Sequence, residues 1–158
     1  MGFWGCVKYL AVTGVVSFIV GRILPKTWFH CDRFPYKSYR WENGGHIYEK
    51  VRIRLWHRKL PDMSRILPKL MPPKKFAFNE IHRLPEMIRE TCVAELIHSL
   101  LCIAGLHCIS IWQGCGGTIV AILNIIGNFP FILIQRYNRP RLIHLRDQAA
   151  KRSGLCEC

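Results

Sequence analysis

The chain has 158 residues, half of them hydrophobic, and carries a net charge of +13. It is too short for two substantial soluble domains, and a small soluble domain rarely combines so much apolar sequence with so much positive charge. Long uncharged runs also argue against a nucleic-acid-binding protein, because a basic balance alone is a weak signal. A membrane protein has both features naturally, in apolar spans and basic loops. We therefore expect one membrane domain over residues 1–158, all-α, with about three transmembrane helices plus interfacial amphipathic helices.

The first apolar segment predicts a transmembrane helix over about residues 3–24. A cleaved signal peptide is the alternative. Lys8 lies inside the apolar run instead of before it, and the stretch from Gly21 to Pro25 is a poor cleavage site for a signal peptidase. These features favour an uncleaved membrane helix.

Residues 25–91 are basic and rich in aromatic side chains, a combination that suits the lipid headgroup layer. Within them, residues 46–60 have apolar side chains at helical spacing, which favours an interfacial helix. Val51, Ile53 and Leu55 also alternate with polar residues, so a strand remains the alternative.

Two further spans follow. A helix is expected to begin near Pro85, a favoured residue of the first helical turn, and to cross the membrane over about residues 95–113. A short glycine-containing turn leads to the third span, 118–134, in which Pro130 is expected to introduce a kink. The tail, 135–158, is expected to carry a short amphipathic helix over residues 142–151.

The distribution of charge predicts the orientation. The basic segments 25–91 and 135–158 should both face the cytoplasm, because Lys and Arg are enriched in cytoplasmic loops. Three spans then bring Glu95 and His98 to the same membrane face as Arg136 and its neighbours. We expect a multi-pass protein of the cell membrane with its site at the cytoplasmic leaflet.

The sequence predicts neither a metal site nor another cofactor. Its eight cysteines include no pair with the spacing and partner ligands of a zinc site. The motif Glu95-x-x-His98 is half of a di-iron site, but a second copy is required and none is present.

Glu95 and His98 are neighbours on one face of a helix, so the carboxylate can orient the imidazole as a general base. The alternative is a polar pair that only anchors the helix at the interface. Glu90 lies on the same side of that helix and is a further candidate. Asn128 in the third span is a candidate donor to an oxyanion, with a hydrogen bond between helices as the alternative.

Two motifs carry a resemblance to a known family: Glu86-x3-Glu90-Thr91-x2-Ala94-Glu95-Leu96-Ile97-His98, and Gln135-Arg136-Tyr137-Asn138-Arg139-Pro140-Arg141-Leu142 after Asn128-x-Pro130. From about Tyr48 to Arg146 the chain resembles the glycosyl-4,4′-diaponeurosporenoate acyltransferases. These are small bacterial membrane enzymes of carotenoid glycolipid biosynthesis. The resemblance implies transfer of a fatty acyl group to a sugar hydroxyl of a membrane glycolipid.

The expected co-substrate is an acyl-CoA or an acyl carrier protein, and the expected partner is the glycolipid acceptor. The oligomeric state stays open. Arginine matches phosphate and carboxylate oxygens, although arginines here could equally serve only as topology anchors. A non-catalytic membrane adaptor is the main alternative function, and an intramembrane hydrolase using water on His98 is a weaker one. The expected substrate-binding residues are Gln135, Arg136, Tyr137, Asn138, Arg139, Arg141, Arg54 and Arg58.

Overall fold

The structure, a computed structural model, describes residues 2–56, 78–152 and 154. Throughout these residues the regular elements are helices, which confirms the predicted all-α class. Three helices in the described part are long and apolar enough to cross a membrane, as predicted.

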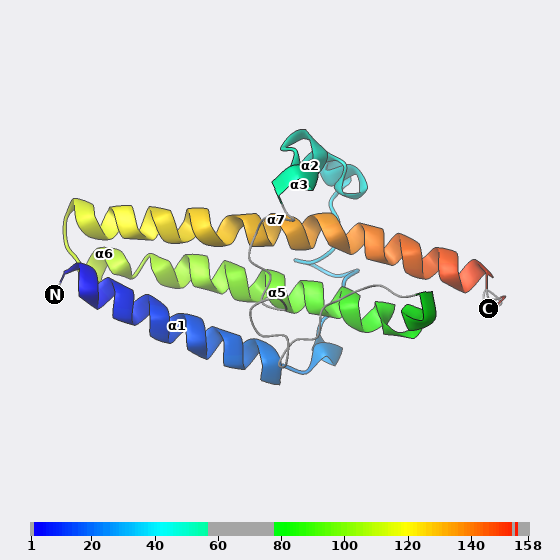
Figure 1. Ribbon diagram of the computed structural model, residues 1–158, viewed down its shortest axis with the longest axis horizontal. Helices are drawn as coiled ribbons and strands as arrows, with labels where there is room; N and C mark the ends of the chain where they lie inside the picture. Colours follow the sequence, from blue (N-terminus) through cyan, green and yellow to red (C-terminus); the bar gives the residue numbers. More distant parts are fainter. Residues whose placement is uncertain (1, 57–77, 153, 155–158) are drawn as a thin grey trace.

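The three long helices are α1 (Phe3–Ile23), α5 (Leu84–Gly105) and α7 (Cys115–Arg152). They lie side by side, with α5 between the other two (Figure 1). Helices α1 and α7 run in one direction and α5 runs in the opposite one. Helix α5 begins within one residue of Pro85, where the sequence predicted a helix start.

A short helix, α6 (Cys108–Ile111), and a tight turn connect α5 to α7. Gly114 adopts a φ of +88° in this turn, a conformation that favours glycine. A Cβ atom on Gly117 would lie 2.2 Å from the backbone oxygen of Trp112, so only glycine lets α7 begin this close to α6.

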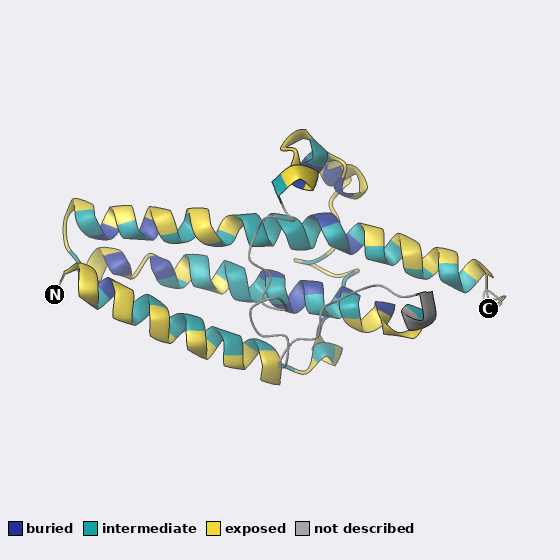
Figure 2. Ribbon diagram, viewed as in Figure 1, coloured by how far each residue is buried: buried dark blue, intermediate teal, exposed yellow. Residues whose placement is uncertain are grey.

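The long helices expose many residues on their outer faces (Figure 2), and many of these residues are apolar. Val12 on α1, Ile103 on α5 and Ile126 on α7 are 63%, 64% and 60% exposed, respectively. Soluble proteins rarely expose apolar side chains over so large a continuous surface. The hydrocarbon of a bilayer is the environment that suits it.

Helix α7 differs from the prediction, because one continuous helix replaces the expected span and separate amphipathic helix at 142–151. It continues through Pro130 and Pro140. On either side of Pro140, Arg139 and Arg141 make the hydrogen bonds described below. With 38 residues it is about 57 Å long at 1.5 Å per residue, against about 30 Å for a hydrocarbon core. About half of α7 therefore projects beyond the membrane.

The short helices α2 (Ile47–Lys50) and α3 (Ile53–Trp56) lie beside the middle of α7 (Figure 1). The predicted helix at 46–60 is present as two pieces, separated at Arg52, whose φ is +52°, and residues 57–60 lie outside the described part. Tyr48 and Ile53 from these pieces pack against Tyr137 of α7 in a buried cluster. The short elements are η1 (Lys26–Trp28), η2 (Arg40–Gly45), α2 (Ile47–Lys50), α3 (Ile53–Trp56) and, before α5, η3 (Phe78–Arg83).

Candidate active site at the end of the apolar spans

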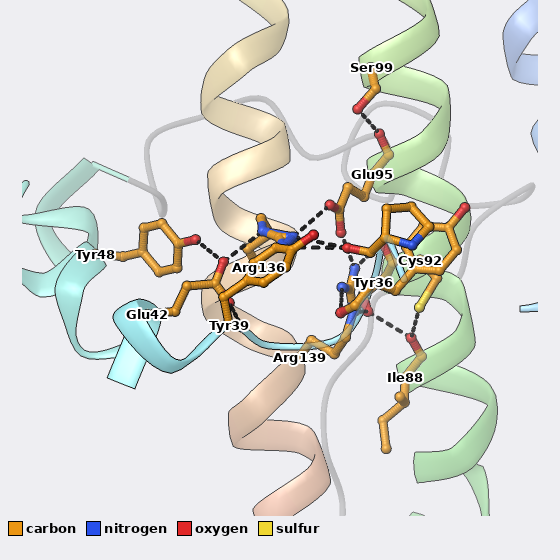
Figure 3. A network of polar contacts seen from close by, with 12 residues as sticks. Tyr36, Tyr39, Glu42, Tyr48, Ile88, Cys92, Glu95, Ser99, Arg136 and Arg139 are labelled. Atoms are coloured by element: carbon orange, nitrogen blue, oxygen red, sulfur yellow. Dashed lines mark hydrogen bonds and ion pairs between the residues drawn. The ribbon is translucent and has the colours of Figure 1, made fainter. Parts of the chain in front are cut away.

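A buried ionic network lies where the apolar run of α7 ends. Arg136 and Arg139 are three residues apart on α7 and so lie on one face of the helix, opposite Glu95 of α5. One oxygen of Glu95 accepts a hydrogen bond from Nη1 of Arg136 at 3.1 Å, and the other accepts one from Nη2 of Arg139 (Figure 3). The structure thus brings together α5 and α7 residues that the sequence predicted to share one membrane face.

Glu42 of η2 is the second acid of this network, and it is 1% exposed. Its Oε1 accepts hydrogen bonds from Nε of Arg136 at 2.8 Å and from the Tyr48 hydroxyl at 2.6 Å. Its Oε2 accepts one from the backbone N–H of Tyr39 at 2.8 Å. Two carboxylates thus face two guanidinium groups, the pairing that buried charges require.

Sequence reasoning missed Glu42 and Tyr48. The available local signal was the spacing of Tyr39 and Glu42, which are three residues apart as in a capping box. Burial, together with the hydrogen bond to Glu42, raises the pKa of Tyr48. The phenol therefore stays protonated at neutral pH and donates to the carboxylate.

Arg139 is 3% exposed, and protein groups occupy its guanidinium. Its Nε donates to the Thr91 hydroxyl at 2.8 Å, its Nη2 donates to the Thr91 backbone oxygen at 3.2 Å, and its Nη1 donates to the Tyr36 backbone oxygen at 2.6 Å. The sequence predicted Arg139 as a substrate ligand. In the structure its hydrogen bonds join α5, α7 and the segment around Tyr36.

The predicted pairing of Glu95 with His98 does not match the structure. The two arginines hold the Glu95 carboxylate, because charge-assisted bonds to guanidinium are stronger than a bond to a neutral imidazole. Nδ1 of His98 lies 3.0 Å from Oδ1 of Asn128 instead, and Phe131 stacks on the imidazole with 4.7 Å between ring centroids. His98 lies about one helical turn beyond Glu95, toward the apolar part of α5.

Asn128 is the predicted oxyanion donor, and its side-chain amide donates within α7 to the backbone oxygen of Asn124 at 2.9 Å and to the Asn124 Oδ1 at 3.2 Å. Its own Oδ1 lies 3.0 Å from Nδ1 of His98 on α5, which is the contact between helices given as the alternative for this residue.

Glu90 belongs to an ion-pair cluster between α5 and the end of α1. Nζ of Lys26 lies 2.7 Å from Glu90 and 2.6 Å from Glu86. Burial lowers the pKa of Lys26, but its hydrogen bonds to the two carboxylates outweigh that effect, so the pKa is raised. These ion pairs hold the segment that follows α1 against α5.

Two arginines converge on the hydroxyl of Tyr137 at the solvent side of the network. Nε of Arg54 donates to this oxygen at 3.2 Å, and Nη1 of Arg141 donates to it as well, with its guanidinium over the ring. Tyr137 is buried, but the side chain of Arg54 is 62% exposed and Arg141 is exposed. Nη2 of Arg54 also pairs with Oε1 of Glu49 at 2.5 Å, so Arg141 is the more accessible of the two cations for an anionic ligand.

Three predicted substrate ligands remain, Gln135, Asn138 and Arg58. Gln135 and Asn138 are half-buried on α7, and Arg58 lies outside the described residues. Among the described residues, no three His, Cys, Asp or Glu side chains are grouped so that they could hold a metal ion.

A hollow of about 210 Å³ adjoins the network and is lined by Cys31, Tyr36, Ser38, Glu42, Gly44, Arg136, Arg139, Pro140 and Ile143.

Comparison with known proteins identifies the family. The family model described as glycosyl-4,4′-diaponeurosporenoate acyltransferase matches residues 25–148, a match that includes Glu42 and begins before Tyr48. No solved structure matches the chain.

Curated relatives from Staphylococcus aureus carry the same name. The protein of Staphylococcus aureus strain MRSA252 is 30% identical over 147 residues, which cover 89% of this chain and 85% of the relative. That of strain Newman is 30% identical over 156 residues, covering 94% and 90%. The chain therefore belongs to the glycosyl-4,4′-diaponeurosporenoate acyltransferase family and is an enzyme of the acyltransferase class.

Proposed function

We propose that this enzyme transfers a fatty acyl group from acyl-CoA or an acyl carrier protein to a sugar hydroxyl of a membrane glycolipid, with His98 as general base. The relatives are named for a glycosyl diaponeurosporenoate, and we propose an acceptor of that class. The observation that carries the proposal is the position of His98, one turn from the charged network and at the start of the apolar part of α5. A glycolipid presents its sugar at this depth, next to its apolar chain.

The chemistry follows from an imidazole with one free ring nitrogen. Nε2 of His98 takes the proton of the sugar hydroxyl, and the oxygen attacks the thioester carbonyl carbon. The carbonyl oxygen becomes an oxyanion, for which the positive charge of Arg136 is the proposed stabilising group; the guanidinium of Arg136 also donates to Glu42, Glu95 and the backbone oxygen of Pro35. Collapse expels the thiolate, which takes the proton back from the imidazolium, leaving an ester and a free thiol.

Arg54 and Arg141 are proposed to hold the phosphates of the acyl donor. Arg141 is exposed, and the side chain of Arg54 is 62% exposed although it also pairs with Glu49. Arg141→Gln is expected to raise the KM for the donor about tenfold, which corresponds to a loss of about 1.4 kcal/mol of binding. Arg146→Gln on the same helix is the control, since Arg146 pairs with Asp147 at the surface. If the donor KM of a folded Arg141→Gln enzyme equals that of the control, these arginines do not bind the donor.

We further propose that the network and its hollow face the cytoplasm, because the segments around them carry most of the Lys and Arg. With every other cysteine replaced, Cys115 is expected to react with an impermeant thiol reagent in intact cells. A cysteine placed at Lys37 is expected to react only after permeabilisation. Labelling of the Lys37 position in intact cells would contradict this orientation.

The function itself is tested with purified protein in lipid vesicles that contain the glycolipid acceptor, supplied with labelled acyl-CoA or labelled acyl carrier protein. Label is expected in the glycolipid. Release of the label as free fatty acid alone would indicate the hydrolase instead. Absence of label from both products, with folded protein and either donor, would indicate the non-catalytic adaptor, an alternative that the family comparisons disfavour.

A further inference from the structure

A file of polar groups runs between α5 and α7 inside the apolar part of the bundle. The side-chain amide of Asn124 donates to the backbone oxygen of Leu101 at 2.8 Å. The side-chain amide of Asn128 donates to Oδ1 of Asn124 at 3.2 Å. Oδ1 of Asn128 then lies 3.0 Å from Nδ1 of His98. In a membrane such groups must satisfy one another, because water does not compete for them.

Two backbone oxygens fix the direction of the file. A backbone oxygen only accepts, so Asn124 must turn its NH2 group toward Leu101 and its Oδ1 toward Asn128. The backbone oxygen of Asn124, 2.9 Å from the Asn128 amide nitrogen, likewise requires Asn128 to turn its NH2 toward Asn124 and its Oδ1 toward the imidazole. An amide oxygen cannot donate, so Nδ1 of His98 must carry the hydrogen.

We propose that Asn124 and Asn128 are positioning residues that select the His98 tautomer with a protonated Nδ1 and an unprotonated Nε2. A neutral imidazole has a single N–H, so fixing it at Nδ1 leaves Nε2 as the base. The catalytic meaning of this selection rests on the proposed function. The selection itself rests only on the hydrogen bonds between α5 and α7.

Gly105 supports this assignment independently. A Cβ atom at this position would lie 2.0 Å from Nδ2 of Asn124, so any larger residue would push the amide away from the Leu101 oxygen. Because Gly105 has no side chain, the Asn124 amide can reach the Leu101 backbone oxygen, where the file of hydrogen bonds ends. Gly127, next to Asn128, offers a matched control, because a Cβ atom there would have nothing within 4 Å.

The test is ¹⁵N NMR of the full chain in lipid nanodiscs with labelled histidine, in which the His98 signals are assigned from their absence in His98→Ala. The wild-type enzyme is expected to show a protonated Nδ1 and a bare Nε2. Asn128→Leu is expected to lose this preference, because it removes the acceptor that faces Nδ1. Gly105→Ala is expected to weaken it less, because the backbone oxygen of Asn124 still holds the Asn128 amide, and Gly127→Ala is expected to keep it. A protonated Nε2 in the wild type, or an Asn128→Leu spectrum identical to that of Gly127→Ala, would overturn the proposal.

Activity provides the second readout. Asn128→Leu is expected to lower kcat about tenfold or more with little change in either KM, because the wrong tautomer presents a proton where a base is needed. The NMR result does not depend on activity, so the two proposals fail separately. If Asn128→Leu changes the tautomer but His98→Ala remains active, the assignment of His98 as the base fails while the tautomer selection stands.

Discussion

His98→Ala is expected to lower kcat by about 10²- to 10⁴-fold, the usual contribution of a positioned general base. His98→Gln is not expected to restore activity, because glutamine cannot accept the proton at neutral pH. Initial rates of acyl transfer in vesicles, measured with saturating donor and acceptor, give this comparison directly.

His144→Ala is the matched control, because His144 is exposed on α7. The contact described for its side chain is with Gln148, one helical turn away. Its kcat is expected to stay near that of the wild type. If a folded His98→Ala enzyme keeps more than about a tenth of wild-type kcat, the loss falls below the range for a general base and the assignment is wrong.

Arg139→Gln is expected to lower the free energy of unfolding by about 3–5 kcal/mol, because it leaves part of the Glu95 charge buried without its partner. Arg146→Gln makes the same chemical change on the same helix but removes an exposed pair, so a loss of about 0–1 kcal/mol is expected there. Unfolding of both variants in detergent, monitored by circular dichroism, measures the difference.

A double-mutant cycle separates the ion pair from other effects of Arg139. Glu95→Gln combined with Arg139→Gln is expected to cost less than the sum of the two single changes, because the double variant leaves neither charge of this pair unmatched. Additive losses, or equal losses for Arg139→Gln and Arg146→Gln, would show that the buried pair does not hold α5 and α7 together.

The helices could be predicted from the sequence because each depends on a local pattern. The apolar runs that became α1, α5 and α7 are long enough to span a bilayer, and Pro85 marks a helix start by its own geometry. The continuation of α7 past Pro140 could not be predicted this way. It depends on contacts of Arg139 with α5, which lie far away in the sequence.

The candidate site was predicted only in part for the same reason. Residue spacing placed Glu95 beside His98, but spacing does not show which partner wins, and two guanidinium groups from α7 bind the carboxylate more strongly than a neutral ring. Glu42 is 94 residues from Arg136, so no local pattern connects them. The charge balance of the buried network could have suggested that a second acid was needed.

The central claim, transfer of a fatty acyl group to a glycolipid, is tested most directly by mass spectrometry of lipids from cells that make the glycosyl diaponeurosporenoate acceptor and express this chain. The acceptor is expected to be converted into a species heavier by one fatty acyl group, at a position on the sugar, and the conversion should disappear with His98→Ala. An acceptor whose mass stays unchanged, although the wild-type chain is present and folded in the membrane, would contradict the claim.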